Sequence, residues 1–268
     1  MNKRTDKLFA LLKMKSGTPA FSISQLQFSF SRLFLFSIVY SLLSVTLSSC
    51  KDKKDDTVFD FQYAYAPIDS GHYVIYDVDS MVYNYNQVAT IDSAHYQLME
   101  IITDTTYDLN ELCYRLERYR RPDQNSPWVI DRVWKVKRNA TTFQKDEDDM
   151  WFVKLVFPPS SDEEWNGNIY IPASSDPFRD FQDWNYHYQN LGMPFTINGM
   201  VFNTTVMVAE INDTSNIITR KVRNEVYALH VGMIYQEWEI LKKQDTSNDW
   251  QTGPLNGFRI RMKINSHN

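Results

Sequence analysis

The stretch FTINGMVFNTTVMVAEI, Phe195 to Ile211, contains a turn signal between two strand-like runs. Its Asn198-Gly199 dipeptide is a strong signal for a two-residue β-hairpin turn, because both residues tolerate the positive φ angles that such a turn requires. The residues on either side are strand-like, with many β-branched and apolar side chains. The stretch therefore predicts two antiparallel strands joined by a tight turn.

The same pattern extends through most of the chain after residue 59. Hydrophobic residues recur with a period close to two, and turn residues follow every 8 to 14 positions, which is typical of short antiparallel strands. The segment MWFVKLVF, Met150 to Phe157, is apolar on both faces and predicts a central, covered strand. We expect roughly ten strands in the strand-like segments 71–85, 94–104, 111–121, 127–138, 150–157, 165–172, 195–211 (the hairpin), 216–231, 233–244 and 257–265.

One segment, residues 176–190, predicts a helix. Asp176 is a suitable cap, Pro177 suits the first helical position, and four aromatic residues follow at roughly helical spacing: Phe178, Phe181, Trp184 and Tyr188. The predicted fold is mainly β. We expect a single curved antiparallel sheet or a partly closed β-barrel, similar to lipoprotein carriers, with one short inserted helix.

The amino-terminal segment RLFLFSIVYSLLSVTLSSC ends at Cys50. A membrane-spanning helix needs about 20 predominantly apolar residues, whereas this run is shorter and contains five serines, which fits a secretory signal better. The residues Leu47-Ser48-Ser49-Cys50 resemble a bacterial lipobox, in which the cysteine is lipidated and becomes the mature N-terminus. An uncleaved membrane helix is the alternative.

These features predict three parts: a signal peptide at 1–49 that is removed, a lipidated tether at 50–58, and a β-rich globular domain at 59–268. Acyl chains such as palmitate on Cys50 would hold the protein at a bilayer. We expect the outer membrane of a Gram-negative bacterium, on its periplasmic face or at the cell surface. Lys51 to Asp56 resembles the export tag of surface lipoproteins, and an ordinary solvated tether is equally compatible with this charge run.

Charge and cysteine content exclude several classes of protein. Residues 1–49 hold six Lys or Arg and one Asp, so the remainder carries a formal charge of about −10, which argues against a nucleic-acid partner. If Cys50 is lipidated, Cys113 has no partner, which excludes a disulfide scaffold and a cysteine-based zinc site. Cys113 is predicted to be a buried thiol.

No motif indicates catalysis. The five histidines lack metal-ligand spacing, and no G-x-S-x-G, S-x-x-K or P-loop occurs. The acidic runs Asp146–Asp149 and Asp162–Glu164 lack the spacing of a calcium loop and predict solvated hairpin loops. We therefore expect no catalytic residue, no metal and no cofactor.

The best candidates for ligand binding are aromatic. Exposed Trp and Tyr rings beside Asp and Asn suit sugars, because ring faces stack on C–H patches while polar groups take the hydroxyls. The alternative is that this segment plugs one end of the sheet and packs in the core. The candidate residues are Trp165, Trp184, Tyr186 and Tyr188.

A resemblance supports the fold prediction. The segment RNEVYALHVGMIYQEWEI, Arg223 to Ile240, resembles the closing strands of exported proteins of unknown function related to TapB-like and DUF3108 domains. The resemblance covers a small part of the chain and implies a curved antiparallel sheet with no known activity. The residues that carry it are Tyr227, Ala228, Val231, Gly232 and Tyr235.

The sequence thus predicts an envelope-anchored lipoprotein that is not an enzyme and binds a hydrophobic ligand, a glycan or a protein partner. One alternative is an envelope hydrolase that uses carboxylates on the sheet. Another is a structural subunit of an envelope complex. A deep apolar cavity would favour a carrier. A polar cleft with two facing carboxylates would favour a hydrolase, and a filled core with an exposed aromatic patch would favour a structural subunit.

Lipidation of Cys50 is directly testable. Cells expressing the wild-type chain or Cys50→Ala are grown with a fatty-acid analogue, and label on the purified protein is measured. We expect the wild type to be labelled and the variant to carry no label, because the acyl chains are attached through this thiol. Equal labelling of both would contradict the prediction.

Overall fold

The protein's structure, a computed structural model, describes residues 59–247 and 249–268. Cys50, the predicted signal peptide and the predicted tether lie outside the described residues. The described chain forms one twelve-stranded sheet in the order β6-β5-β4-β3-β2-β1-β12-β11-β10-β9-β8-β7. Every neighbouring pair is antiparallel, and all pairs except β1 with β12 are consecutive along the chain. The predicted fold class is therefore confirmed.

Most connections between strands are short, whereas residues 166–185 form a long connection between β7 and β8. Only two 3₁₀ turns, η1 and η2, occur in the described residues. The predicted hairpin at Asn198-Gly199 is present, and both residues have positive φ angles, of 48° and 78°. The elements are η1 (Tyr63–Tyr65), β1 (Tyr73–Asn86), β2 (Val88–Asp108), β3 (Glu111–Arg121), β4 (Val129–Arg138), β5 (Thr142–Glu147), β6 (Met150–Val156), β7 (Glu164–Trp165), η2 (Phe178–Phe181), β8 (Tyr186–Ile197), β9 (Met200–Asp213), β10 (Thr219–Ala228), β11 (Gly232–Lys243) and β12 (Leu255–His267).

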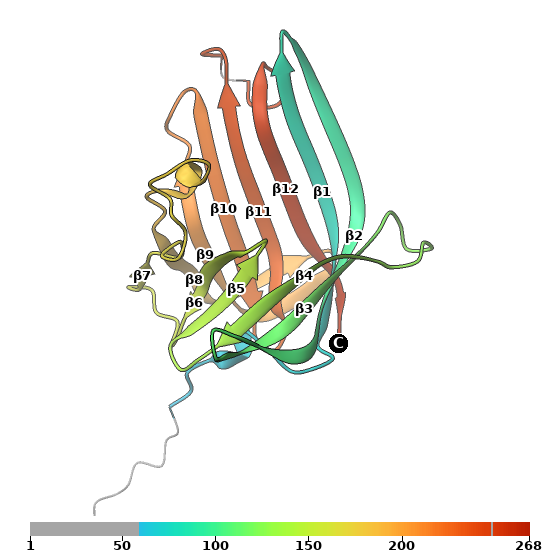
Figure 1. Cartoon of the computed structure of the whole chain (residues 1–268), viewed down its shortest axis with the longest axis vertical. Helices are drawn as coiled ribbons and strands as arrows, with labels where there is room; N and C mark the ends of the chain where they lie inside the picture. Colours follow the sequence, from blue (N-terminus) through green and yellow to red (C-terminus); the bar gives the residue numbers. More distant parts are fainter. Residues whose placement is uncertain (1–58, 248) are drawn as a thin grey trace, which may run out of the picture. The chain divides into compact units, whose positions relative to one another are not determined.

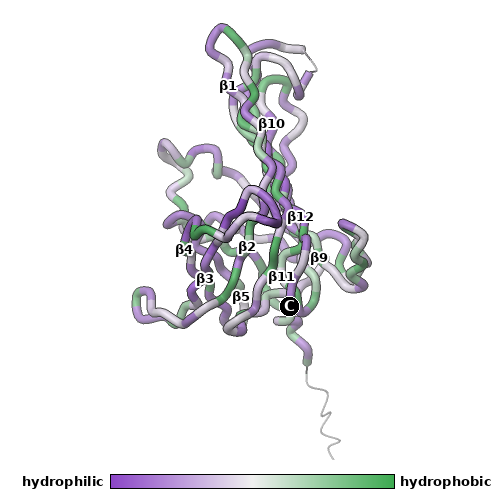
Figure 2. The backbone as a smooth tube through the Cα atoms, turned by 90° about the vertical axis from the view of Figure 1, so that its right-hand side faces the viewer, coloured by the Kyte–Doolittle hydropathy of each residue, from purple (hydrophilic) through white to green (hydrophobic). Residues whose placement is uncertain are grey.

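The strands differ in length, so the domain has an upper part formed by the long strands alone and a lower part that contains all of them. Strands β1, β2, β10, β11 and β12 form a tall wall, whereas β3 to β6 cross only its lower part (Figure 1). Residues 88–96 of β2 pair with β1 alone, because pairing with β3 begins at Gln97. The upper wall is a narrow single layer, and the lower part is broader (Figure 2). The main core cluster lies inside the curved lower part.

Side chains join the two ends of the sheet into a nearly closed barrel. Trp165 on β7 donates its indole N–H to the carbonyl oxygen of Val153 on β6, at 2.8 Å. The Tyr188 hydroxyl on β8 donates to the carbonyl oxygen of Val156 at 2.6 Å and accepts from its N–H at 2.8 Å. One backbone bond, from Val153 N–H to the Gly167 carbonyl at 2.8 Å, completes this seam.

The prediction that Met150 to Phe157 forms a central strand was wrong in one respect. Strand β6 is the terminal strand of the sheet. It is nevertheless covered, and Phe152 and Leu155 have 0% exposure, because the other end of the sheet curls round to meet it. An apolar pattern on both faces indicates that a strand is buried, not that it lies at the centre of a sheet. A barrel seam buries a terminal strand as fully as a central one.

The predicted inserted helix is shorter than its sequence pattern indicated. Only Phe178–Phe181 is helical, as a 3₁₀ turn, and Gln182 is already extended with a ψ of 144°. From Tyr186 onward the chain is strand β8, which pairs with β9 through His187 and Ala209. Pairing with the long β9 overrides the helical spacing of the aromatic residues, since propensity yields to tertiary contacts. Cys113 is a buried free thiol, as predicted.

Candidate functional site

The interior of the barrel contains five buried charged residues, which we call the ion cluster: Glu147, Lys154, Glu210, Arg223 and Glu225. Lys154 projects from β6, and its Nζ lies 2.8 Å from Glu225 on β10, 3.0 Å from Glu210 on β9 and 3.3 Å from Glu147 on β5. The exposure of the Lys154 side chain is 0%. The ammonium therefore connects the terminal strand β6 to strands from the opposite half of the sheet.

Arg223 is the second cation of the cluster and is also fully buried. Its Nη2 lies 2.7 Å from Glu147, and its Nε lies 3.1 Å from Glu210. Its guanidinium carbon lies 4.1 Å from the centroid of the Trp238 ring, in cation–π geometry. A buried charge is costly unless it is paired and hydrogen-bonded. Arg223 is paired with three glutamates, but only its Nη2 donates a hydrogen bond, to Glu147, while its Nε and Nη1 have no hydrogen-bond acceptor among the described residues.

Three carboxylates share the two cations, and their pKa values diverge. Burial favours the neutral form of Glu147, but the nearby Arg223 and Lys154 outweigh it and lower the pKa of this carboxyl below its ordinary value of 4.5. Burial dominates at Glu210 and raises its pKa. Glu225 accepts hydrogen bonds from Tyr227 and Gln236. Tyr227 bonds the Oε2 that the cations leave free, whereas Gln236 shares Oε1 with Lys154.

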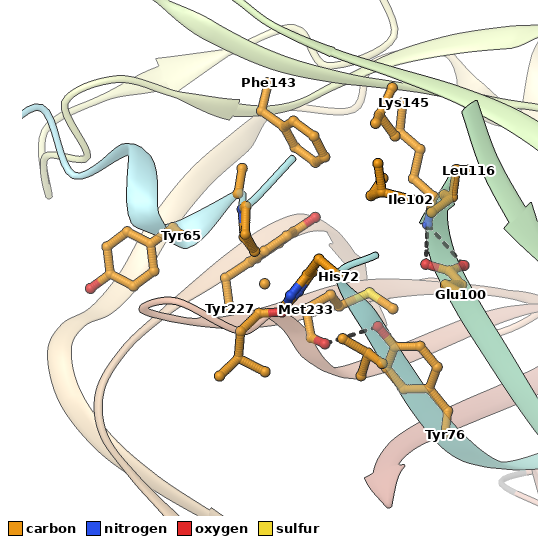
Figure 3. A pocket seen from close by; sticks show the side chains of 16 residues that line it. Tyr65, His72, Tyr76, Glu100, Ile102, Leu116, Phe143, Lys145, Tyr227 and Met233 are labelled. Carbon is orange, nitrogen blue, oxygen red and sulfur yellow. Dashed lines mark hydrogen bonds and ion pairs between the residues drawn. The ribbon is translucent and has the colours of Figure 1, made fainter. Parts of the chain in front are cut away.

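Next to the cluster, an apolar cavity of about 60 Å³ lies near η1. Figure 3 shows its lining, with Tyr65, Phe143, Ile102 and Leu116 around the space and the Glu100–Lys145 ion pair at one side. The Tyr76 hydroxyl donates to the carbonyl oxygen of Met233 at 2.9 Å, which satisfies a buried polar group.

A larger cavity of about 240 Å³ lies on the concave face and shares Glu100, Lys145 and Met233 with the apolar one. Its lining combines charged side chains with aromatic rings. We call it the arginine cavity. It is lined by Tyr96, Leu98, Glu100, Arg118, Arg120, Asp131, Arg132, Trp134, Lys145, Glu147, Asp148, Met150, Met233, Gln236, Trp238, Ile260 and Met262.

Strand alternation explains why the arginines face this cavity. Side chains two residues apart on a strand share a face, so Arg118 and Arg120 follow the buried Leu116 on the inner face of β3. In the pairing of β3 with β4, Leu116 lies opposite Trp134 and Arg118 opposite Arg132. The same register that builds the core thus places the arginines beside tryptophan.

Aromatic rings hold two of the arginines in place. The guanidinium carbon of Arg118 lies 3.7 Å from the centroid of the Trp134 ring, and that of Arg120 lies 3.7 Å from the Tyr96 ring. Trp134 is itself fixed, because its indole N–H donates to Asp148 at 3.0 Å. Stacked guanidinium groups keep their N–H edges free for other acceptors.

The four aromatic residues proposed from the sequence lie at the seam of the barrel. Trp184, Tyr186 and Tyr188 are 3%, 0% and 3% exposed, and Trp165 is half-buried with its indole bonded to Val153. The structure brings these residues together, with Trp165 and Tyr188 ring centroids 4.8 Å apart. This placement corresponds to the alternative in which the segment packs in the core.

Sequence reasoning missed the ion cluster and the arginine cavity. The acidic run Asp146–Asp149 was predicted to be a solvated loop, yet Asp146 and Glu147 are 4% and 7% exposed. This part of the prediction was wrong because only Asp148 and Asp149 form the turn between β5 and β6. A usable signal was the single Lys154 inside an apolar strand, since an unpaired lysine is almost never fully buried.

No group of three or more potential metal-ligating side chains occurs within residues 59–247 and 249–268. In the same residues, no helix has the length and apolar character needed to cross a membrane.

No protein-family model matches the chain, and no curated protein matches it. The resemblance of Arg223–Ile240 to TapB-like and DUF3108 domains therefore stays a prediction. Similar chains are found among the solved structures. A candidate lipoprotein from Parabacteroides distasonis is 8% identical with a TM-score of 0.39, and the match covers 76% of this chain and 98% of that one. A candidate exported protein with a YmcC-like fold from Bacteroides fragilis is 10% identical with a TM-score of 0.33, covering 75% and 98%.

The lowered pKa of Glu147 predicts a pH-dependent contribution to stability. A carboxyl with a depressed pKa in the folded state stabilises the protein above its unfolded pKa, and this contribution is lost as the pH falls. Glu147→Gln should therefore lower the free energy of unfolding by on the order of 3 kcal/mol near pH 7. The difference from the wild type should shrink as the pH falls below the ordinary value of 4.5.

Urea unfolding of both proteins between pH 7 and pH 3 measures this difference. Glu111→Gln is the control, because Glu111 forms an exposed ion pair with Lys137 and should change stability by less than about 1 kcal/mol. A Glu147→Gln deficit that is equally large at pH 3 and pH 7 would contradict the role given to the ionised carboxylate.

Proposed function

We propose that this protein is a lipid-anchored envelope lipoprotein of the bacterial outer membrane that binds a small polar ligand, without catalysis, in the arginine cavity. The observation that carries the proposal is the pair of arginines stacked on Trp134 and Tyr96 at this cavity. Ligand sites typically combine aromatic walls with a few fixed polar groups that orient the ligand. Lipidation of Cys50 would supply the membrane attachment.

The fixed position of these groups supports binding. Arg118 is held by a ring and by Glu100, whose carboxylate oxygen lies 3.1 Å from its Nε. A group that is already ordered loses little conformational entropy when a ligand arrives, so preorganisation favours affinity. Trp134, which stacks on Arg118, and Asp148, which accepts from Arg132 and Trp134, add an aromatic ring and a carboxylate to the wall of this cavity.

The small apolar cavity favours a polar ligand over an acyl chain. An engineered apolar cavity of about 150 Å³ binds one benzene molecule, whereas the cavity near η1 measures about 60 Å³. The arginine cavity has four times this volume, about 240 Å³. Of the ligand classes that the sequence predicted, a glycan therefore fits the interior better than a hydrophobic molecule does.

The ion pairs favour binding over hydrolysis. A general acid in a glycosidase needs a raised pKa. Burial would raise the pKa of Asp148, but hydrogen bonds from Arg132 and Trp134 lower it. Glu147 is also held with a lowered pKa. Glu210 has a raised pKa, but its side chain is fully buried and does not line the arginine cavity.

Co-purification tests the proposed binding. The full-length protein is extracted from membranes in mild detergent, and small molecules released by denaturation are identified by mass spectrometry. We expect a molecule that is retained by the wild type and at least about tenfold depleted in Trp134→Leu, because loss of the ring removes a stacking surface and frees Arg118.

Trp128→Leu is the matched control. Trp128 stacks with Arg121 at 4.1 Å but does not line the arginine cavity, so this variant should retain the molecule. Circular dichroism confirms that each variant is folded. If no retained molecule distinguishes the folded Trp134→Leu variant from the wild type, the cavity is not the binding site.

A further inference from the structure

Three arginines converge on one face of β3 and β4. Arg118 and Arg120 are neighbours on the inner face of β3, and Arg132 pairs directly opposite Arg118 on β4. Like charges placed directly opposite each other on neighbouring strands are destabilising. This placement therefore costs stability unless nearby anions offset the charge.

The carboxylates of this chain offset the charge only in part. Glu100 is shared between Arg118, at 3.1 Å, and Lys145, at 3.0 Å. Two cations therefore divide a single carboxylate. The two cations that share the Glu100 carboxylate come from different strands, because Lys145 projects from β5 and Arg118 from β3.

The other carboxylates that line the cavity form ion pairs with Arg132 or with the cations of the ion cluster. Arg132 pairs with Asp148 and, at 3.7 Å, with Asp131. Glu147 pairs with Arg223 and Lys154. Neither Asp131 nor Asp148 forms an ion pair with Arg118 or Arg120 among the described residues.

Arg120 has no carboxylate partner within 4.0 Å in the described part of the chain. It is exposed, and its guanidinium lies over Tyr96 at 3.7 Å. Stacking on the ring fixes the plane of the group and leaves its N–H donors free. Arg120 is thus an oriented, uncompensated cation on the accessible side of the arginine cavity.

We propose that the ligand of the arginine cavity carries a phosphate group, which Arg120 binds together with Arg118. This inference rests on the proposed function and names the chemical class of its ligand. The planar guanidinium fork matches phosphate oxygens in two parallel hydrogen bonds, and such charge-assisted bonds are about twice as strong as neutral ones. A phosphorylated sugar and a phospholipid headgroup share this chemistry.

Isothermal titration of the full-length protein in detergent tests the proposal, with glucose 6-phosphate as the first probe and glucose as its uncharged counterpart. We expect binding of glucose 6-phosphate and at least about tenfold weaker binding of glucose. Arg120→Gln should weaken glucose 6-phosphate binding by about tenfold to a hundredfold. Arg120→Lys should recover part of the loss, because it keeps the charge without the fork.

Arg115→Gln is the matched control on the same strand. Arg115 pairs with Glu117 on the surface and does not line the arginine cavity, so its loss should leave the affinity unchanged. Equal weakening by Arg115→Gln and Arg120→Gln would indicate a general charge effect and overturn the assignment. Affinity that is unchanged in Arg120→Gln would also overturn it.

A second probe separates the two sources of phosphate. Dihexanoyl phosphatidic acid carries the same phosphomonoester on a short-chain lipid, so preferential binding of this probe assigns a lipid headgroup, and preferential binding of glucose 6-phosphate assigns a sugar. If neither phosphorylated probe binds while a co-purified molecule still depends on Trp134, the phosphate inference fails and the proposed function stands. If no co-purified molecule depends on Trp134 either, both fail.

Discussion

The buried ammonium of Lys154 ties one end of the sheet to strands of its opposite half. It lies at the middle of the terminal strand β6 and reaches glutamates on β5, β9 and β10 at 2.8 to 3.3 Å. Two ends of an antiparallel sheet normally expose unpaired edges. Here, the ion cluster and the bonds of Trp165 and Tyr188 at the seam hold those ends together. An isolated charge in this interior would be costly, and we infer that the cluster specifies how the barrel closes.

Closure also shapes the arginine cavity. Strand β5 contributes Glu147 to the cluster and Lys145 to the cavity wall, two residues apart on one face. Fixing Glu147 through Arg223 therefore positions Lys145, which in turn holds Glu100 near Arg118. Two sets of buried ion pairs, one around Glu147 and one around Glu100, are thus joined through strand β5, so the closed barrel and the proposed binding site share this strand.

The sequence predicted the antiparallel sheet, because period-two patterns and the Asn198-Gly199 turn are local signals. It did not predict the seam, since covering of β6 depends on strands far away in the chain. The length of the helix was overestimated. The aromatic residues near Tyr186 are spaced as in a helix, but pairing with β9 makes this part of the chain a strand. The ion cluster was missed because its glutamates look like ordinary surface charges, and only tertiary closure brings them to Lys154.

A double-mutant cycle on Lys154 and Glu225 tests most directly whether the ion cluster closes the barrel. Urea unfolding is measured for the wild type, Lys154→Met, Glu225→Gln and the double variant. Each single substitution should cost about 3 to 5 kcal/mol, because it removes one partner of a fully buried charge and leaves the charges of the cluster unbalanced. The double variant should cost at least about 1 kcal/mol less than the sum of the two. Costs that add within about 0.5 kcal/mol would contradict the account.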